Sequence, residues 1–230
     1  VFGVCNVVGS TISRETHAGA YTHAGPEIGV ASTKAFTTQI TLLTLIALKL
    51  GKEKGTLSNS NFHAYLQQME LIPAKVEEIL AQDDNIKTIA SEFLTTPSCL
   101  FLGRGYNFPV ALEGALKLKE ISYIHAEGYP AGELKHGPLA LVDDDMPVIA
   151  VAPNNELLEK LRSNLQEVRA RGGELIVFAA GDSGFKAEPG VTVVPLPNVH
   201  PVLAPIVYVI PLQLLSYHVA VYKGTDVDQP

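Results

Sequence analysis

The chain has 230 residues, of which 47% are hydrophobic and 18% are charged, and its formal net charge at pH 7 is −7. This composition predicts a packed globular protein, because a disordered chain needs low hydrophobicity and high net charge. No block of lysine and arginine stands out, which argues against a nucleic-acid-binding protein.

The first 95 residues contain apolar runs followed by helical patterns. Hydrophobic periodicity predicts two short strands and three helices here. In chain order these are strands over 1–8 and 18–22, a helix from Ser32-Thr33 to about Gly51, and helices over 61–81 and 84–94. Glycine, lysine, serine and asparagine over 51–60 indicate a loop.

After Thr95-Thr96-Pro97 the pattern changes to short apolar strands that alternate with helices. The expected strands are 99–102, 147–152, 175–180 and 191–196, and the expected helices are 109–123, 155–171 and 202–222. Such alternation predicts βαβ units and a parallel sheet covered by helices on both faces. The sequence therefore predicts a three-layer α/β fold with an internal boundary near residue 95.

The cysteines and the most apolar stretch bear on the cellular setting. Cys5 and Cys99 lie in short apolar runs without CxxC spacing, which predicts buried, reduced thiols in a cytoplasmic protein and no zinc site. The stretch 202–222 is interrupted by prolines and polar residues, so it predicts a buried helix and no membrane span.

The chain opens abruptly on a strand, without a signal-peptide pattern, which predicts that it is incomplete.

The most informative segment is the helix around 112–121. At about 100° per residue, Glu113, Lys117 and Glu120 fall within roughly 60° of one another, whereas Lys119 points elsewhere. A narrow charged stripe on an otherwise apolar helix requires pairing, which these spacings allow. Two interpretations are open: a structural ion pair, or a proton-transfer site in which burial and a neighbouring ammonium tune a carboxylate.

The next segment, 127–138, is rich in glycine and proline and predicts an irregular loop. Its two histidines, counting His125 just before it, and its two glutamates make it chemically dense. A histidine here is suited to proton transfer near neutral pH, and a solvated turn is the alternative. Metal ligation by His125, Glu127, Glu133 and His136 has no recognised spacing, so no metal is expected.

Two further segments are candidate anion sites. The helix entry Val30-Ala31-Ser32-Thr33-Lys34 offers free N–H groups and a favourable dipole, although an ordinary cap explains the same residues. Gly103-Arg104-Gly105 follows a strand but lacks the full G-x-G-x-x-G pattern, so no dinucleotide cofactor is expected.

Five blocks of the sequence carry a resemblance to a known family, and they cover residues 27–36, 103–105, 111–121, 131–141 and 224–230. They resemble the isomerase region of the bacterial type of glutamine–fructose-6-phosphate amidotransferases (glucosamine-6-phosphate synthases). The resemblance implies two SIS (sugar isomerase) domains, each a flavodoxin-like three-layer sandwich with a parallel sheet. Residues 1–95 would hold the later part of the first domain and connecting helices, and 96–230 the second domain.

The resemblance also implies a reaction and roles for particular residues. Fructose 6-phosphate and glutamine-derived ammonia give glucosamine 6-phosphate, the product of amino-sugar biosynthesis, without cofactor or metal. Glu120 would move a proton between C1 and C2, and His136 would open the sugar ring across a homodimer interface. Lys117 and Glu113 would support the proton transfer. Val30 and Ser32 would contact the sugar.

The resemblance also shows departures from the family pattern. The family's phosphate loop lies upstream of Val1, its Schiff-base lysine lies beyond Pro230, and its glutaminase domain is a separate N-terminal partner. The chain is therefore expected to have little activity alone and to expose apolar surface near Val1. The alternatives are a phosphosugar-binding SIS sensor module, and a related sugar-phosphate isomerase or deglycase.

Overall fold

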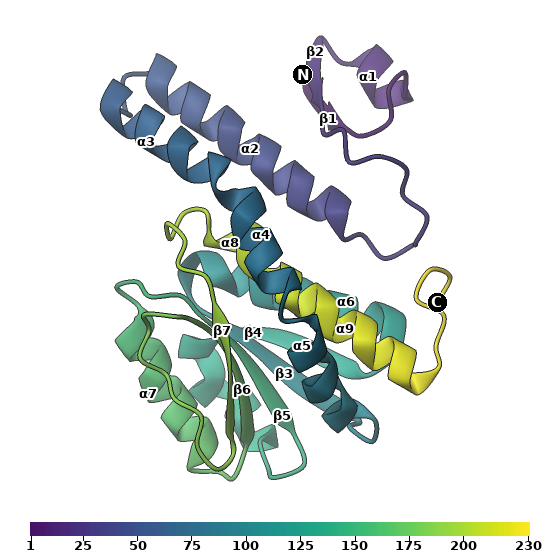
Figure 1. Cartoon of the computed structure of the whole chain (residues 1–230), viewed down its shortest axis with the longest axis vertical. Coiled ribbons are helices and arrows are strands. Elements are labelled where there is room, and N and C mark those ends of the chain that lie inside the picture. The colour runs from purple at the N-terminus through teal and green to yellow at the C-terminus, as the bar shows by residue number, and fades with distance from the viewer. The chain divides into compact units, whose positions relative to one another are not determined.

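The computed structural model describes all residues, Val1–Pro230, and divides into two compact units, Val1–Ile72 and Pro73–Pro230. The first unit contains a parallel pair of strands and three helices (Figure 1). These elements are β1 (Phe2–Cys5), α1 (Thr11–Glu15), β2 (Ala18–Tyr21), α2 (Lys34–Glu53) and α3 (Asn59–Glu70). The sequence did not predict the short helix α1, which begins after Ser10, whose side chain accepts a hydrogen bond from the Ser13 N–H.

The second unit is built on a parallel five-stranded sheet in the order β4-β3-β5-β6-β7. Its strands are β3 (Ser98–Gly103), β4 (His125–Pro130), β5 (Pro147–Ala152), β6 (Glu174–Ala180) and β7 (Val191–Leu196). Its helices are α5 (Asp83–Ala90), α6 (Phe108–Ser122), α7 (Leu158–Arg169), α8 (Ala204–Tyr208) and α9 (Ile210–Lys223), and α4 (Ile72–Leu80) starts at the unit boundary. The predicted α/β parallel-sheet fold is confirmed.

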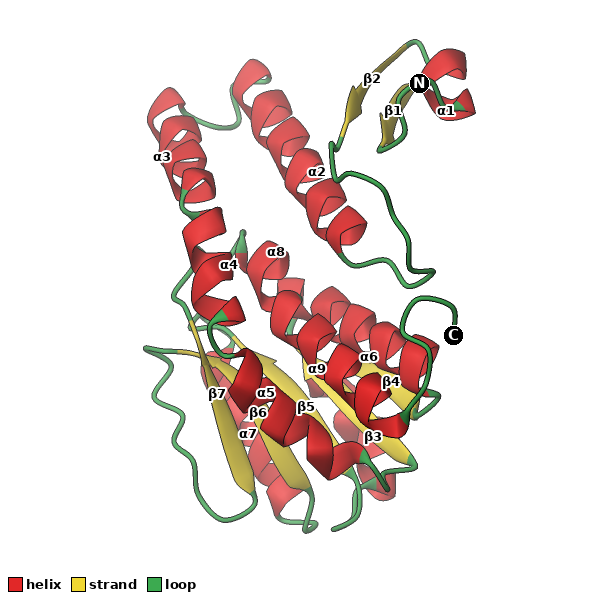
Figure 2. Cartoon of the chain, turned by 45° about the vertical axis from the view of Figure 1, so that its right-hand side comes forward, coloured by secondary structure: helices red, strands yellow, loops and turns green.

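Helices cover both faces of this sheet, and α7 lies on the opposite face from α5 and α9 (Figure 2). Alternate residues of each strand face α7, as in Leu100, Val148 and Val177, which share one buried cluster with Leu161 and Leu165. The central strands read as continuous apolar runs because both of their faces are buried.

The structure corrects the predicted loop at its start, because His125–Pro130 forms the edge strand β4, paired in parallel with β3. The glycine and proline content of residues 127–130 is typical of a loop, so the loop prediction was wrong for these residues. Gly128 is required where α6 packs against the strand, since a Cβ there would lie 2.9 Å from the Leu112 Cα. Pro130 ends the strand at the sheet edge, where a missing N–H is tolerated.

Two predicted helices are each divided in the structure. The segment 61–81 becomes α3 and α4, with Pro73 in the first turn of α4, where its missing N–H is tolerated. The segment 202–222 becomes α8 and α9. By length and hydropathy, Ala204–Lys223 is apolar enough to cross a membrane, which corrects the expectation that it falls short. However, 67% of its most apolar window is buried, which confirms the predicted buried helix.

The compact units divide at Ile72, earlier than the predicted domain boundary near residue 95. Helix α5 packs against α9, so it belongs physically with the second unit. The assignment of 1–95 and 96–230 to two family domains stays a prediction. Both cysteines are free and buried, as predicted, and burial raises the pKa of the Cys99 thiol to about 12.

Candidate active site

Helix α6 carries the predicted charged stripe, and local chemistry sets both of its ends. Pro109 lies in the first turn, where the missing N–H costs no hydrogen bond. Tyr123 ends the helix in the left-handed conformation, with φ 59°. On the inner side, a Cβ on Gly114 would lie 2.7 Å from Leu212 and 2.9 Å from Phe101. This close approach of α6 to β3 and α9 fixes which side of the helix the stripe occupies.

Lys117 lies between the two glutamates of the stripe. Its Nζ is 2.5 Å from Glu120 Oε2 and 3.5 Å from Glu113 Oε1. The exposed fraction of the side chain is 4% for Lys117, 10% for Glu113 and 34% for Glu120. The predicted pairing is therefore confirmed, and Glu120 is the carboxylate of the stripe that reaches solvent.

The buried position of Glu113 perturbs its carboxyl group. Burial raises its pKa above the ordinary value, and the Lys117 ammonium opposes this effect without cancelling it. Glu113 Oε1 is buried and has no hydrogen-bond partner, so its 3.5 Å separation from Lys117 is a charge contact. The environment of Glu113 therefore favours the protonated form of its carboxyl group more than water does.

The outer end of the stripe has the features of a proton-transfer site. A partly exposed carboxylate, Glu120, is held by an ammonium that leaves its remaining oxygen available to a small molecule. Leu112 and Leu116 are also exposed on this helix, so the surface is partly apolar. A purely structural ion pair would need only Lys117 and Glu113. It would not require Glu120, the second carboxylate, at the surface of the helix.

The segment after β4 turns through two short 3₁₀ helices, η3 (Ala131–His136) and η4 (Pro138–Leu141). Ala131 and Leu134 are fully buried and anchor it, and Lys135 Nζ lies 2.9 Å from Glu167 Oε1 on α7. His136 faces solvent, with a side chain 75% exposed and Nε2 3.9 Å from Glu133 Oε2. Within this chain, His136 makes no hydrogen bond or ion pair with the stripe.

On β4, the side chains of His125, Glu127 and Tyr129 form a row of polar contacts, which the sequence analysis did not predict. The Tyr129 hydroxyl donates to Glu127, and His125 Nε2 lies 3.5 Å from Glu127 Oε1. The hydrogen bond to Glu127 raises the pKa of Tyr129. The i, i+2, i+4 spacing was the available signal, but it is informative only once this segment is known to be a strand. Across residues 1–230, no group of three or more His, Cys, Asp or Glu side chains is arranged to hold a metal.

Val30 and Ser32 belong to the first unit and precede α2. Val30 is exposed and Ser32 is half-buried. Thr33 is the N-cap residue of α2, and it makes no side-chain capping hydrogen bond. The ordinary capping explanation for these residues is therefore not supported, and their role as an anion or sugar contact stays a prediction.

Gly103-Arg104-Gly105 lies where the sheet order reverses, beyond the carboxyl ends of β3 and β5, the usual ligand position in an open parallel sheet. The structure fills this crevice with side chains. Arg104 Nη1 donates to Asn164 Oδ1 at 2.7 Å, and Leu157, Leu158 and Leu161 line the little space that remains. Arg104 thus ties the β3 loop to α7, and the loop is not an open phosphate cradle.

Comparison with known proteins confirms the resemblance. The chain is 62% identical over 227 residues to glutamine–fructose-6-phosphate aminotransferase (isomerizing) from Pseudomonas syringae pv. tomato, and 59% identical to the enzyme of that name from Escherichia coli O157:H7. Both alignments cover 99% of this chain, which spans 37% of the length of these relatives.

Solved structures show the same relationship. The C-terminal domain of glucosamine-fructose-6-phosphate aminotransferase from Francisella tularensis superposes with a TM-score of 0.97 and 52% identity, covering 99% of this chain and 64% of that one. A tagatose-6-phosphate ketose/aldose isomerase from Escherichia coli, at 16% identity and a TM-score of 0.75, shares the fold. The SIS domain model matches residues 1–49 and 93–223, so the chain belongs to the SIS domain family.

Proposed function

We propose that this chain is the isomerase part of a glutamine–fructose-6-phosphate aminotransferase, which forms glucosamine 6-phosphate from fructose 6-phosphate and ammonia derived from glutamine. The observation that carries the proposal is identity of about 60% over 99% of the chain to enzymes of that name. The charged stripe of α6 gives the proposal a chemical basis, because isomerisation of an open-chain sugar needs a positioned proton carrier.

In the proposed mechanism Glu120 is the base. It takes a proton from C1 of the open-chain intermediate and returns it to C2, so the carboxylate is regenerated, while the proton of the C1 hydroxyl passes to the C2 nitrogen as C1 becomes the aldehyde. Lys117, at 2.5 Å, stabilises the ionised carboxylate before transfer and holds its orientation. Glu113 balances the charge of Lys117 from the buried side. The partial exposure of Glu120 supports its role, because the substrate must reach the base.

His136 is proposed as the acid–base group that opens the sugar ring. Its imidazole is exposed and uncommitted to the stripe of its own chain, which supports a contribution to the site of a second copy in a homodimer. Val30 and Ser32 are proposed to contact the sugar. We also propose a cytoplasmic location, which the two free, buried cysteines support.

The test measures glucosamine 6-phosphate formed from fructose 6-phosphate and ammonium by the longer protein that contains this chain. We expect Glu120→Gln to lower kcat by a factor of about 10²–10⁴, the usual contribution of a positioned acid–base group. Lys119→Gln is the matched control, because Lys119 is exposed on the same helix outside the stripe. It should leave the rate unchanged.

Three outcomes are informative. Ammonium-dependent product, lost in Glu120→Gln alone, supports the proposed function and the base. Full activity in Glu120→Gln would assign the stripe to a structural ion pair. Conversion of the sugar phosphate without any need for ammonium would favour a plain isomerase.

A further inference from the structure

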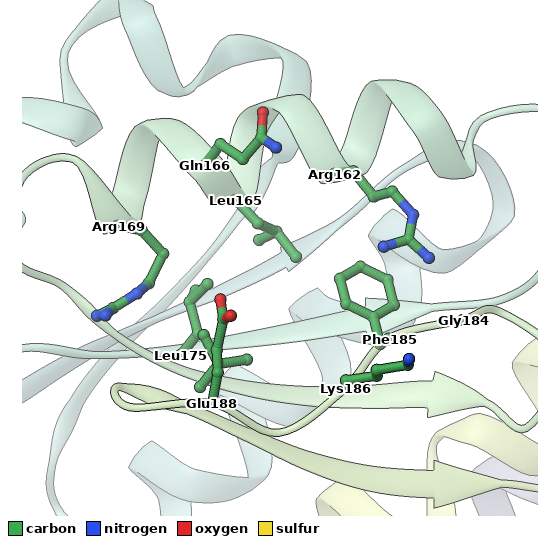
Figure 3. A pocket seen from close by; sticks show the side chains of 10 residues that line it. Arg162, Leu165, Gln166, Arg169, Leu175, Gly184, Phe185, Lys186 and Glu188 are labelled. Atoms are coloured by element: carbon green, nitrogen blue, oxygen red, sulfur yellow. The ribbon is translucent and has the colours of Figure 1, made fainter.

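A hollow lies between α7 and the connection from β6 to β7 in the second unit (Figure 3). These strands are parallel neighbours, and residues 181–190 return from the end of β6 to the start of β7 without forming a helix. A crossover helix usually covers this part of a parallel sheet. Here the extended connection leaves a cavity of about 270 Å³, which we call the α7 pocket.

The floor of the α7 pocket is apolar. Leu165 of α7, Leu175 of β6 and Val191 of β7 line it with side chains that are almost fully buried. Phe185 forms one wall, and the Arg162 guanidinium lies 4.2 Å from the centre of its ring. The pocket therefore offers a flat aromatic wall and an aliphatic floor to the body of a small molecule.

Two arginines of α7 hold in place the connection 181–190, which carries the Phe185 wall. Arg162 donates to the carbonyl of Ser183, and Arg169 donates to the carbonyls of Gly173 and Pro189 at 2.8 and 2.7 Å. These bonds join both ends of the wall to the helix. A site whose walls are already held in place loses less entropy when a ligand binds.

The charged groups around the pocket are mainly positive. Arg162, Arg169 and Lys186 line it together with one carboxylate, Glu188 (Figure 3). The hydrogen bonds of the two arginines go to neutral carbonyl groups, which do not cancel the positive charge. Glu159 offsets part of the Arg162 charge at 3.3 Å. The ammonium of Lys186 is exposed and has no ion-pair partner, so it is available to a ligand.

We propose that the α7 pocket binds a small phosphate monoester with an apolar or ring-shaped body. The phosphate would lie near Lys186 and the arginines, and the body would cover Leu165 and Phe185. The volume lies just below the range of about 300–1,000 Å³ of ordinary ligand pockets, which excludes a dinucleotide. Because α7 and α6 lie on opposite faces of the sheet, this site is separate from the charged stripe, and the proposal does not depend on the proposed function.

The test titrates the 230-residue chain with phenyl phosphate and follows the backbone amides of Gly184 and Gly190 by NMR. We expect saturable shifts at these glycines, weaker binding of inorganic phosphate, and no such binding of benzylamine. Comparing phenyl phosphate with inorganic phosphate tests whether the apolar floor contributes to binding. Comparing phenyl phosphate with benzylamine tests whether the site prefers a negative charge.

Two variants of opposite charge sharpen the test. Lys186→Gln should weaken phenyl phosphate binding about two- to fivefold, and Glu188→Gln should strengthen it by a similar factor, as expected for partly exposed charges. Both side chains are exposed, so neither change threatens the fold. Lys160→Gln is the control, because Lys160 is exposed on α7 outside the pocket and should have no effect.

Opposite shifts of affinity in the two variants, with the control unchanged, would support the α7 pocket. The proposal is overturned if no saturable shift occurs at Gly184 and Gly190, or if both variants change the affinity in the same direction. Loss of binding in Lys117→Met, with no effect of Lys186→Gln, would place the phosphate at the charged stripe and also overturn it.

Discussion

The two compact units form their secondary structure in similar ways but bury very different amounts of apolar surface. In the first unit, Val1–Ile72, the buried hydrophobic residues are Cys5, Ala35, Leu48 and Ile72. The second unit buries the centres of β3, β5 and β6 completely on both faces. Both units contain parallel strands, two in the sheet of the first unit and five in the sheet of the second.

This contrast shows that a regular backbone and a stable core have separate origins. The strands β1 and β2 form one parallel ladder with each other, and α2 forms its hydrogen bonds within the helix. A two-stranded sheet, however, gains little from burial, because each strand still has an open edge and exposed faces. In the second unit, layered packing converts the same kind of strand into a core, so substitutions should have larger effects there.

The largest expected effect tests that difference in the core. Phe101 of β3 is fully buried against α6, and Phe101→Ala should lower the free energy of unfolding by about 3–5 kcal/mol through lost burial and a cavity. Leu43→Ala on α2, at a side chain 54% exposed, should change it by less than about 0.5 kcal/mol. Urea denaturation compares the two variants. Similar losses in both would contradict the contrast between the units.

The next effect compares a buried ion pair with an exposed one. Lys117→Met removes the cation between Glu113 and Glu120, and should cost about 3 kcal/mol at neutral pH, because a buried carboxylate loses its partner. Lys49→Met breaks the exposed pair with Glu53 on α2 and should have a much smaller effect, because solvent screens exposed pairs. Thermal unfolding measures both changes. A stable Lys117→Met protein would show that the stripe is well solvated.

The smallest effect is a difference in pH dependence between two glutamates. Burial raises the pKa of Glu113, so this group stabilises the fold fully below its unfolded pKa, and the contribution is lost as the pH rises through the folded pKa. Glu113→Gln should therefore gain stability relative to the parent protein as the pH rises from the unfolded pKa of the glutamate through its raised folded pKa.

Glu53 should behave in the opposite way. Lys49 lowers its pKa, so its contribution is present above its unfolded pKa and is lost as the pH falls through the folded pKa. Glu53→Gln should lose a little stability relative to the parent protein as the pH rises. Denaturation midpoints measured at several pH values compare the two slopes. Slopes of the same sign would show that burial does not control the Glu113 carboxyl.

The sequence determined most of the fold of the second unit and the composition of its stripe. Runs such as Pro147–Ala152 are apolar on both faces, which is the pattern of a central parallel strand, and both β5 and β7 occur at the predicted bounds. The position of Lys117 between Glu113 and Glu120 follows from helical periodicity alone, which the covalent backbone sets.

Only the tertiary structure decided the rest, because those features join residues far apart in the chain. The strand β4 has one neighbour, and its mixed sequence is accepted only at the sheet edge beside Gly128 and α6. Packing of α6 against β3 and α9 decided that Glu113 is buried and Glu120 is partly exposed. The α7 pocket exists only because residues 181–190 return along α7. No local pattern in the sequence predicts that this connection and α7 lie side by side.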